Sequence, residues 1–144
     1  MKVIIGKPSR RKLKQKVKVK IHDYDTWNVD TTLAYIIAPM LKQLKDTTHG
    51  APPVDLKDVP SHLWPTTFDQ ETGVIKNDGD INLYFDRWDW ILDEMIFAFE
   101  SKIGDFEDQF FTEEGYDQKA HEIEQKRVEN GFKLFGKYYE SLWD

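Results

Sequence analysis

The stretch that decides the fold is Ile81–Ile103, INLYFDRWDWILDEMIFAFESKI. Its large apolar side chains recur every three or four residues, the spacing that places them on one face of a helix. They are Ile81, Phe85, Trp88, Leu92, Met95, Phe99 and Ile103. A second apolar line contains Leu83, Trp90 and Phe97. A helix with two apolar lines is covered on more than one side, so we predict that it is central in the fold or that it also faces another subunit.

Two further helices are predicted, one on either side of this stretch. Residues 30–47 begin with Asp30, a residue type that caps helix N-termini, and they contain Pro39, where we expect a kink because proline removes an amide donor. Residues 116–142 carry the apolar line Val128, Phe132, Phe135, Tyr139 and Leu142. Gly131 and Gly136 lie in this helix and would permit close approach of another backbone.

A β-hairpin and a long loop complete the predicted elements. Residues 2–5 form a short apolar run, and residues 16–22 alternate between basic and aliphatic side chains, the period of a half-buried strand. The loop 47–80 is irregular and rich in proline. Its first half carries apolar anchors as far as Phe68, which we expect to hold it on the core, whereas 69–80 is the better candidate for a mobile or binding loop.

These patterns predict an α-rich α+β fold with three main helices, at about 30–47, 81–103 and 116–142. The chain has 144 residues, a length that suits one domain, and we predict a single domain spanning 1–144. Within it, residues 1–22 would form a basic hairpin or arm and residues 23–144 an acidic helical body.

Charge divides the chain unevenly. The net charge is −6, yet residues 1–20 hold nine Lys or Arg and no acid, so the remaining residues carry a net charge of −15. The basic segment could follow a phosphate backbone, lie against the acidic surface of its own chain or a second copy, or be a lysine-protected edge strand. Nucleic acid binding through 7–20 is not favoured, because residues 1–20 contain no aromatic side chain on which bases could stack.

The sequence lacks the residues and motifs that several kinds of cofactor and metal site require. There is no cysteine, no zinc spacing among the four histidines and no phosphate-binding glycine motif, so we expect no cofactor. The longest apolar runs are too short to cross a membrane. Carboxylates at Asp86, Asp89, Asp93 and Glu100 recur on one helical face, and Asp89 and Asp93 would be the metal ligands if the protein were a Mg²⁺- or Mn²⁺-dependent nucleotide hydrolase. A solvated acidic face is the simpler interpretation.

Aromatic residues are the most unusual feature, at 14% of the chain. Large rings with one polar atom suit ligand pockets and interfaces. A nucleotide-like ligand would be held by stacking and basic groups, for which we select Tyr35, Lys45, His49, Arg87 and Trp88. A homo-oligomer interface is predicted at Trp90, Phe97, Tyr138 and Trp143.

Three stretches carry a resemblance. They are KDTTHGAP at Lys45–Pro52, RWDWILDEMIFAFE at Arg87–Glu100 and GFKLFGKYYESLW at Gly131–Trp143. They resemble a family of small, uncharacterised proteins encoded by tailed bacteriophages. The resemblance implies a phage product made in the cytoplasm of a bacterial host, and it brings no activity or site residue.

The function that we predict is binding rather than catalysis. We expect a phage accessory protein, such as one that counters a host defence by sequestering a nucleotide-like signal or by inhibiting a host protein. Two alternatives remain open: the metal-dependent hydrolase described above, and an acidic nucleic-acid mimic or assembly factor that uses the acidic surface of residues 86–129.

Overall fold

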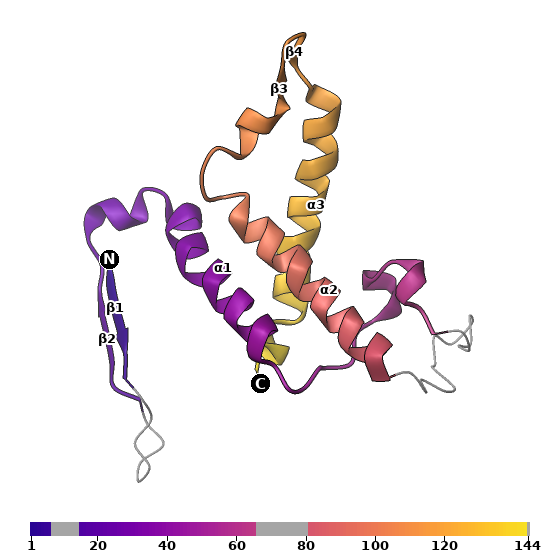
Figure 1. Cartoon of the computed structure of the whole chain (residues 1–144). Coiled ribbons are helices and arrows are strands. Elements are labelled where there is room, and N and C mark those ends of the chain that lie inside the picture. Colours follow the sequence, from indigo (N-terminus) through magenta and orange to yellow (C-terminus); the bar gives the residue numbers. More distant parts are fainter. Residues whose placement is uncertain (7–14, 66–80, 144) are drawn as a thin grey trace. The chain divides into compact units, whose positions relative to one another are not determined.

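The computed structural model describes residues 1–6, 15–65 and 81–143 (Figure 1). The chain forms two compact units, Met1–Leu33 and Ala34–Asp144, and each is described by itself. Three long helices and a short N-terminal antiparallel hairpin confirm the predicted α-rich α+β fold. The first unit extends past the predicted end of the basic segment at residue 22, to a point within the first long helix.

The first unit begins with a two-stranded hairpin. Strand β1 (Lys2–Ile5) pairs antiparallel with β2 (Val17–Lys20), which is shorter than the predicted 16–22. A 3₁₀ turn, η1 (Asp23–Thr26), leads to helix α1 (Val29–Thr47). The prediction that Asp30 caps α1 is wrong, because the helix already begins at Val29 and Asp30 lies in its first turn.

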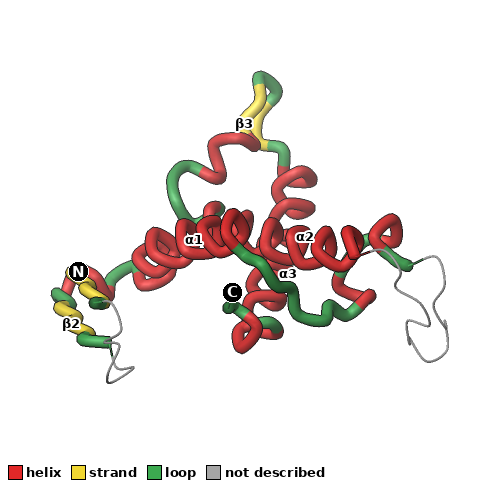
Figure 2. The backbone as a smooth tube through the Cα atoms, turned by 60° about the horizontal axis from the view of Figure 1, so that its bottom comes forward, coloured by secondary structure: helices red, strands yellow, loops and turns green. Residues whose placement is uncertain are grey.

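The second unit is built on two helices, α2 (Ile81–Glu100) and α3 (Gln118–Lys137), which cross each other (Figure 2). The predicted apolar line of α2 is in the core: Trp88, Leu92 and Met95 are fully buried. The Phe99 ring, on the next turn of that line, lies 5.2 Å from the ring of Phe132 and 4.8 Å from that of Phe135. The predicted apolar line of α2 therefore packs against α3.

Gly131 is the point of closest approach between these two helices. A Cβ atom built on Gly131 would clash with the backbone oxygen of Glu94 and lie 2.6 Å from the Cβ of Ala98. Only glycine fits this position without a shift of one helix. Gly136 differs, since a Cβ there meets nothing within 4 Å, so the predicted close approach is correct for Gly131 and wrong for Gly136.

The second half of α1 and the loop after it complete the core. Ala34, Ala38 and Leu41 are buried, and α1 continues through Pro39 to Thr47. The part of the loop that the structure describes, as far as residue 65, contains two 3₁₀ turns, η2 (Leu56–Asp58) and η3 (Ser61–Leu63). Its anchors Leu56, Val59 and Leu63 are buried, which confirms that this part is held on the core. The anchor Phe68 and the candidate loop 69–80 lie outside the described residues.

The connection between α2 and α3 contains structure that the sequence patterns missed. Helix α2 ends at Glu100, before the predicted Ile103, and a 3₁₀ turn η4 (Phe106–Phe110) and a hairpin of β3 (Phe111–Thr112) with β4 (Gly115–Tyr116) follow. Gly104 and Gly115 adopt φ values of +87° and +122°, so the chain cannot continue as a helix through either residue.

The ends of α3 also differ from the predicted 116–142. Asp117 caps α3 by accepting a 2.9 Å hydrogen bond from the Ala120 amide, and the helix ends at Lys137. A short 3₁₀ turn, η5 (Tyr139–Ser141), follows. Among the described helices, none combines the length and the hydropathy that a membrane crossing requires.

Replacing Gly131 with alanine tests the helix contact. We expect Gly131→Ala to lower the free energy of unfolding by about 1–3 kcal/mol, because the added methyl must push α2 away. Gly136→Ala is the matched control in the same helix and should leave stability unchanged or raise it by up to about 1 kcal/mol, since alanine is the better helix former. Urea denaturation measures both, and equal effects of the two substitutions would contradict the close contact.

Candidate functional site

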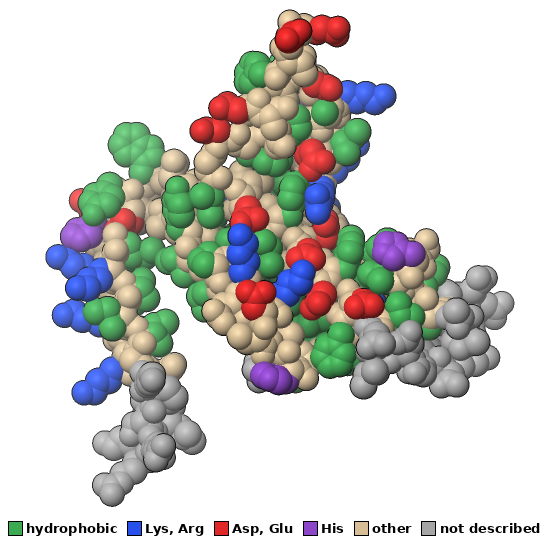
Figure 3. Space-filling view, in the orientation of Figure 1, with side chains coloured by type: hydrophobic (Ala, Val, Ile, Leu, Met, Phe, Trp, Pro, Cys, Tyr) green, Lys and Arg blue, Asp and Glu red, His purple; other side chains and the backbone are tan. Residues whose placement is uncertain are grey.

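The N-terminal hairpin has two chemically different faces. Because side chains alternate along a strand, the pairs Val3–Val19 and Ile5–Val17 share one face, which we call the apolar face. The pairs Lys2–Lys20 and Ile4–Lys18 share the opposite face, which we call the lysine face. Blue side chains line one side of the hairpin and green side chains the other in Figure 3. All eight side chains are exposed.

The first unit has no buried apolar side chain among its described residues. Asp25 is the single buried residue in the described parts of 1–33. Trp27 is 88% exposed, and Tyr24 and Ile21 are exposed as well. This unit therefore presents apolar surface without a core of its own.

A polar contact holds the start of this unit together. The N-terminal ammonium of Met1 lies 2.7 Å from Oδ1 of Asp25, and the His22 amide donates a 2.7 Å hydrogen bond to Oδ2 of the same carboxylate. These two partners hold the pKa of Asp25 below its ordinary value. Asp25 lies in the turn that follows β2 and thereby joins this turn to Met1, the residue before β1.

The second unit contains an apolar groove. It has a volume of about 590 Å³ and lies between the second half of α1 and the C-terminal end of α3. Its lining is formed by Ile37, Met40, Leu41, Leu44, Phe135, Tyr139 and Leu142. Apolar walls without converging polar groups suit contact with apolar side chains better than recognition of a charged small molecule.

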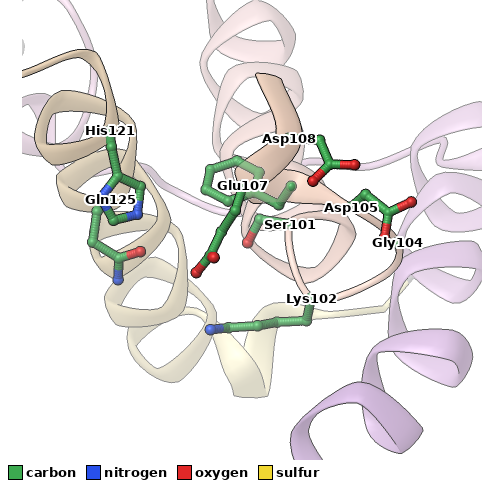
Figure 4. Close-up of a pocket in the computed structure, with 9 residues that line it drawn as sticks. Ser101, Lys102, Gly104, Asp105, Glu107, Asp108, His121 and Gln125 are labelled. Atoms are coloured by element: carbon green, nitrogen blue, oxygen red, sulfur yellow. The ribbon is translucent and has the colours of Figure 1, made fainter. Parts of the chain in front are cut away.

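A smaller, polar pocket lies between α3 and the chain that follows α2 (Figure 4). Its volume is about 350 Å³, and Asp105, Glu107 and Asp108 give it an acidic wall opposite His121 and Gln125 of α3. Rings hold this region together, since His121 lies 5.1 Å from Phe110. In the parts of the chain that the structure describes, no three His, Asp or Glu side chains are arranged to hold a metal ion.

The predicted ligand residues do not form one surface. Tyr35 is exposed on α1, and Lys45, at the end of α1, forms a 2.5 Å ion pair with Asp93. Arg87 and Trp88 are 2% and 0% exposed, and the Arg87 Nε donates a 2.7 Å hydrogen bond to the Leu63 carbonyl. Their assignment to a ligand site needs correction, because both are core residues that hold α2 against the loop. His49 follows α1 and stays a prediction.

The predicted interface residues also divide. Trp143 is exposed, whereas Trp90 and Phe97 are half-buried inside the second unit, where the Phe97 ring lies under the guanidinium of Arg127 at 3.9 Å. Tyr138 is 6% exposed and needs correction, since it is part of the core. An oligomer built on the other three remains a prediction.

The predicted metal ligands Asp89 and Asp93 have other surroundings. Asp93 is paired with Lys45, as described above. Burial raises the pKa of Asp89, and the neighbouring carboxylates of Asp93 and Asp86 add to this against the opposing charge of Lys45. A raised pKa weakens a carboxylate as a metal ligand, because the ligand must be deprotonated.

One polar network around the buried Tyr138 was missed by the sequence patterns. The Tyr138 hydroxyl donates a 2.6 Å hydrogen bond to Oδ2 of Asp58 and accepts a 3.0 Å hydrogen bond from the Asp55 amide. Lys137 forms ion pairs with the carboxylates of both aspartates. The end of α3 is thereby fastened to η2. The predicted apolar line of this helix includes Tyr139, which is 64% exposed, whereas Tyr138 was assigned to an interface. Neither the burial of Tyr138 nor the partners of its hydroxyl were therefore predicted.

Tyr138→Phe tests this network. We expect the free energy of unfolding to fall by about 1.5–3 kcal/mol, the usual range for a hydrogen bond to a charged group. The matched control Tyr139→Phe removes the hydroxyl of an adjacent ring that is 64% exposed, and it should change stability little. Urea denaturation at neutral pH compares the two variants, and a loss of equal size in both would contradict the network.

The same hydroxyl predicts a pH dependence. Burial and the hydrogen bond to Asp58 raise the pKa of Tyr138 to about 12. The unfolded chain releases this proton near pH 10, so the folded state binds more protons between pH 10 and 12 and loses stability as the pH rises through that window. Tyr138→Phe should be less sensitive to pH there than the wild type, whereas Tyr139→Phe should follow the wild type.

Asp25→Asn tests the contact in the first unit. Because the pKa of Asp25 is lowered in the folded state, its contribution is present above the ordinary aspartate pKa of about 3.9 and is lost as the pH falls through the folded value. The amide chemical shift of His22 should report this titration in acid. The shift should no longer titrate in Asp25→Asn, and the control Asp23→Asn should retain it. If the His22 amide shift titrates in acid in Asp25→Asn as it does in the wild type, the contact is contradicted.

No known protein family, no curated protein and no solved structure matches this chain.

Proposed function

We propose that this protein acts by binding a protein partner through the apolar face of its N-terminal hairpin. The observation that carries the proposal is the absence of any buried apolar side chain in the described part of the first unit, together with the exposure of Val3, Ile5, Val17 and Val19.

The energetics of small sheets support a partner. An isolated two-stranded hairpin is marginally stable in water, and chains below about 40 residues rarely fold without staples or association. Each aliphatic side chain removed from water contributes about 25 cal/mol per Å² of apolar area. A partner that covers the apolar face therefore stabilises the hairpin and is recognised by it in the same step. Trp27 extends this surface with a ring of the type that dominates interface energetics.

The partner that we propose is a host protein met in the cytoplasm of a bacterium, in keeping with the phage resemblance. Binding is better supported than sequestration of a nucleotide-like signal, because Arg87 and Trp88 lie in the core. It is also better supported than metal-dependent hydrolysis, since Lys45 already pairs with Asp93. The alternative occupant of the apolar face is a second copy of the chain.

Adjacent residues on opposite faces allow a matched experiment. A photo-crosslinking amino acid is placed at Val19 on the apolar face or at Lys18 on the lysine face of the same strand, and each variant is irradiated in bacterial cells. We expect one discrete protein adduct from position 19 and none of that mass from position 18. The identified protein is then purified, and its binding should be lost in Val19→Asp but retained in Lys18→Asp.

Two results would contradict the proposal. Adducts of the same mass from both positions would show that the apolar face is not selective. An adduct with the mass of two chains, confirmed by a concentration-dependent dimer in sedimentation equilibrium, would assign the face to self-association in place of a host protein.

A further inference from the structure

The lysine face concentrates like charges on a small sheet. The strand register sets Lys2 directly opposite Lys20, and Lys18 lies on the same face two residues before Lys20. Directly opposed side chains have Cβ atoms about 5 Å apart, and like charges in such a pair destabilise the sheet. The hairpin therefore carries a repulsion that its own fold does not relieve.

These lysines also lack acidic partners in the described part of the chain. Lys42, Lys45 and Lys137 of the second unit form ion pairs with carboxylates. The ion pairs of the described residues include none for Lys2, Lys18 or Lys20, and residues 1–20 contain no acid at all. An anion from outside this segment would relieve the repulsion.

We propose that the lysine face binds the phosphate backbone of a double-stranded nucleic acid without reading its sequence. Lys18 and Lys20 are about 7 Å apart along the strand, a distance that spans about two phosphates on one strand of a duplex. A two-stranded β-ribbon is narrow enough to lie along or within a major groove about 12 Å wide. Three ammonium groups on one exposed face then neutralise neighbouring phosphates.

The chemistry of this face selects duplex and backbone contacts. Single strands are bound by aromatic stacking platforms, and residues 1–20 contain no Phe, Tyr or Trp. Lysine acts on phosphate as a point charge, and the remaining side chain on this face, Ile4, has no hydrogen-bonding group with which to read a base edge. The affinity should accordingly be modest and strongly dependent on salt.

The acidic remainder of the chain does not prevent this contact. Its net charge of −15 repels a duplex over long distances, but charges farther away than a Debye length of about 8 Å are largely screened at physiological salt. The local charge of the lysine face decides the contact. This inference uses the face opposite to that of the proposed protein contact, so each can fail without the other.

Salt-dependent binding tests the inference. Fluorescence anisotropy of a labelled DNA duplex of about 20 base pairs and mixed sequence is followed between about 25 and 200 mM salt, with an RNA duplex and a single strand as parallel arms. We expect the full-length protein to bind duplex more tightly than single strand, with an affinity that falls linearly in a plot of log K against log salt. The DNA and RNA arms identify which duplex is preferred.

Charge variants locate the contact. The double variant Lys18→Gln, Lys20→Gln should make the slope of log K against log salt shallower by about 1.8. Each lost phosphate contact reduces the magnitude of this slope by about 0.9. Between 50 and 200 mM salt the wild-type affinity should then fall about 12-fold further than that of the variant. Lys119→Gln with Lys126→Gln on α3 is the matched control, since it makes the same change in net charge on exposed lysines of the second unit. Lys18→Arg with Lys20→Arg should restore the slope.

Three results would overturn the inference. The first is no binding of duplex by the wild type at the lowest salt. The second is a wild-type slope in the Lys18 and Lys20 glutamine variant. The third is an equal reduction in the α3 control, which would show that net charge alone governs the association.

Discussion

One contact fixes how the two central helices meet. Gly131 of α3 faces the backbone oxygen of Glu94 of α2, and one turn earlier Arg127 grips the carboxylate of the same glutamate through three hydrogen bonds of 2.7–3.1 Å. Glu94 is buried, whereas the Arg127 side chain is 44% exposed, so removing the arginine would leave a buried carboxylate without its charged partner. Backbone shape and charge pairing therefore select the same register. The core formed by Trp88, the loop and the second half of α1 is assembled around that register.

The fold was predictable where packing alone determines it. The apolar line of α2 identifies its buried face, and the alternation of 16–22 identifies a strand. The predicted half-burial of that strand is wrong, because all four side chains of β2 are exposed. Gly131 and Gly136 show what such patterns cannot predict, namely which of two glycines contacts a neighbouring helix. Both are glycines in the same helix, but only the first meets another backbone, and the identity of the facing residue is a tertiary fact. The end of α2 was misplaced because the chain tightens after Glu100, where the amides of Lys102 and Ile103 bond to carbonyls three residues earlier instead of four.

The candidate site was less predictable, because its residues were selected by side-chain chemistry without regard to whether the fold buries them. Arg87 and Trp88 were chosen for their stacking and charge, yet Trp88 also belongs to the apolar line that predicted the core, and its burial follows from that line. Burial also leaves its indole Nε1 without a hydrogen-bond partner in the described structure, a cost of about 1–3 kcal/mol that the surrounding packing offsets. Arg87 could not be placed from sequence, since its acceptor is a loop carbonyl, that of Leu63.

The first unit differs from the second in that the apolar and basic side chains of its hairpin strands are exposed and are not paired within the described part of the unit. In the second unit, apolar side chains face one another and basic groups such as Arg127 meet acids within the same unit. In the hairpin, a period of two places four aliphatic side chains on one face and three lysines with Ile4 on the other. Neither face finds its complement in the described part of 1–33. A one-residue change of register would exchange the faces of one strand and mix the two chemistries. The ion pair between Met1 and Asp25 opposes such a change, because it ties the residue before β1 to the turn after β2. The register that keeps the two faces distinct is thus the register that this contact holds.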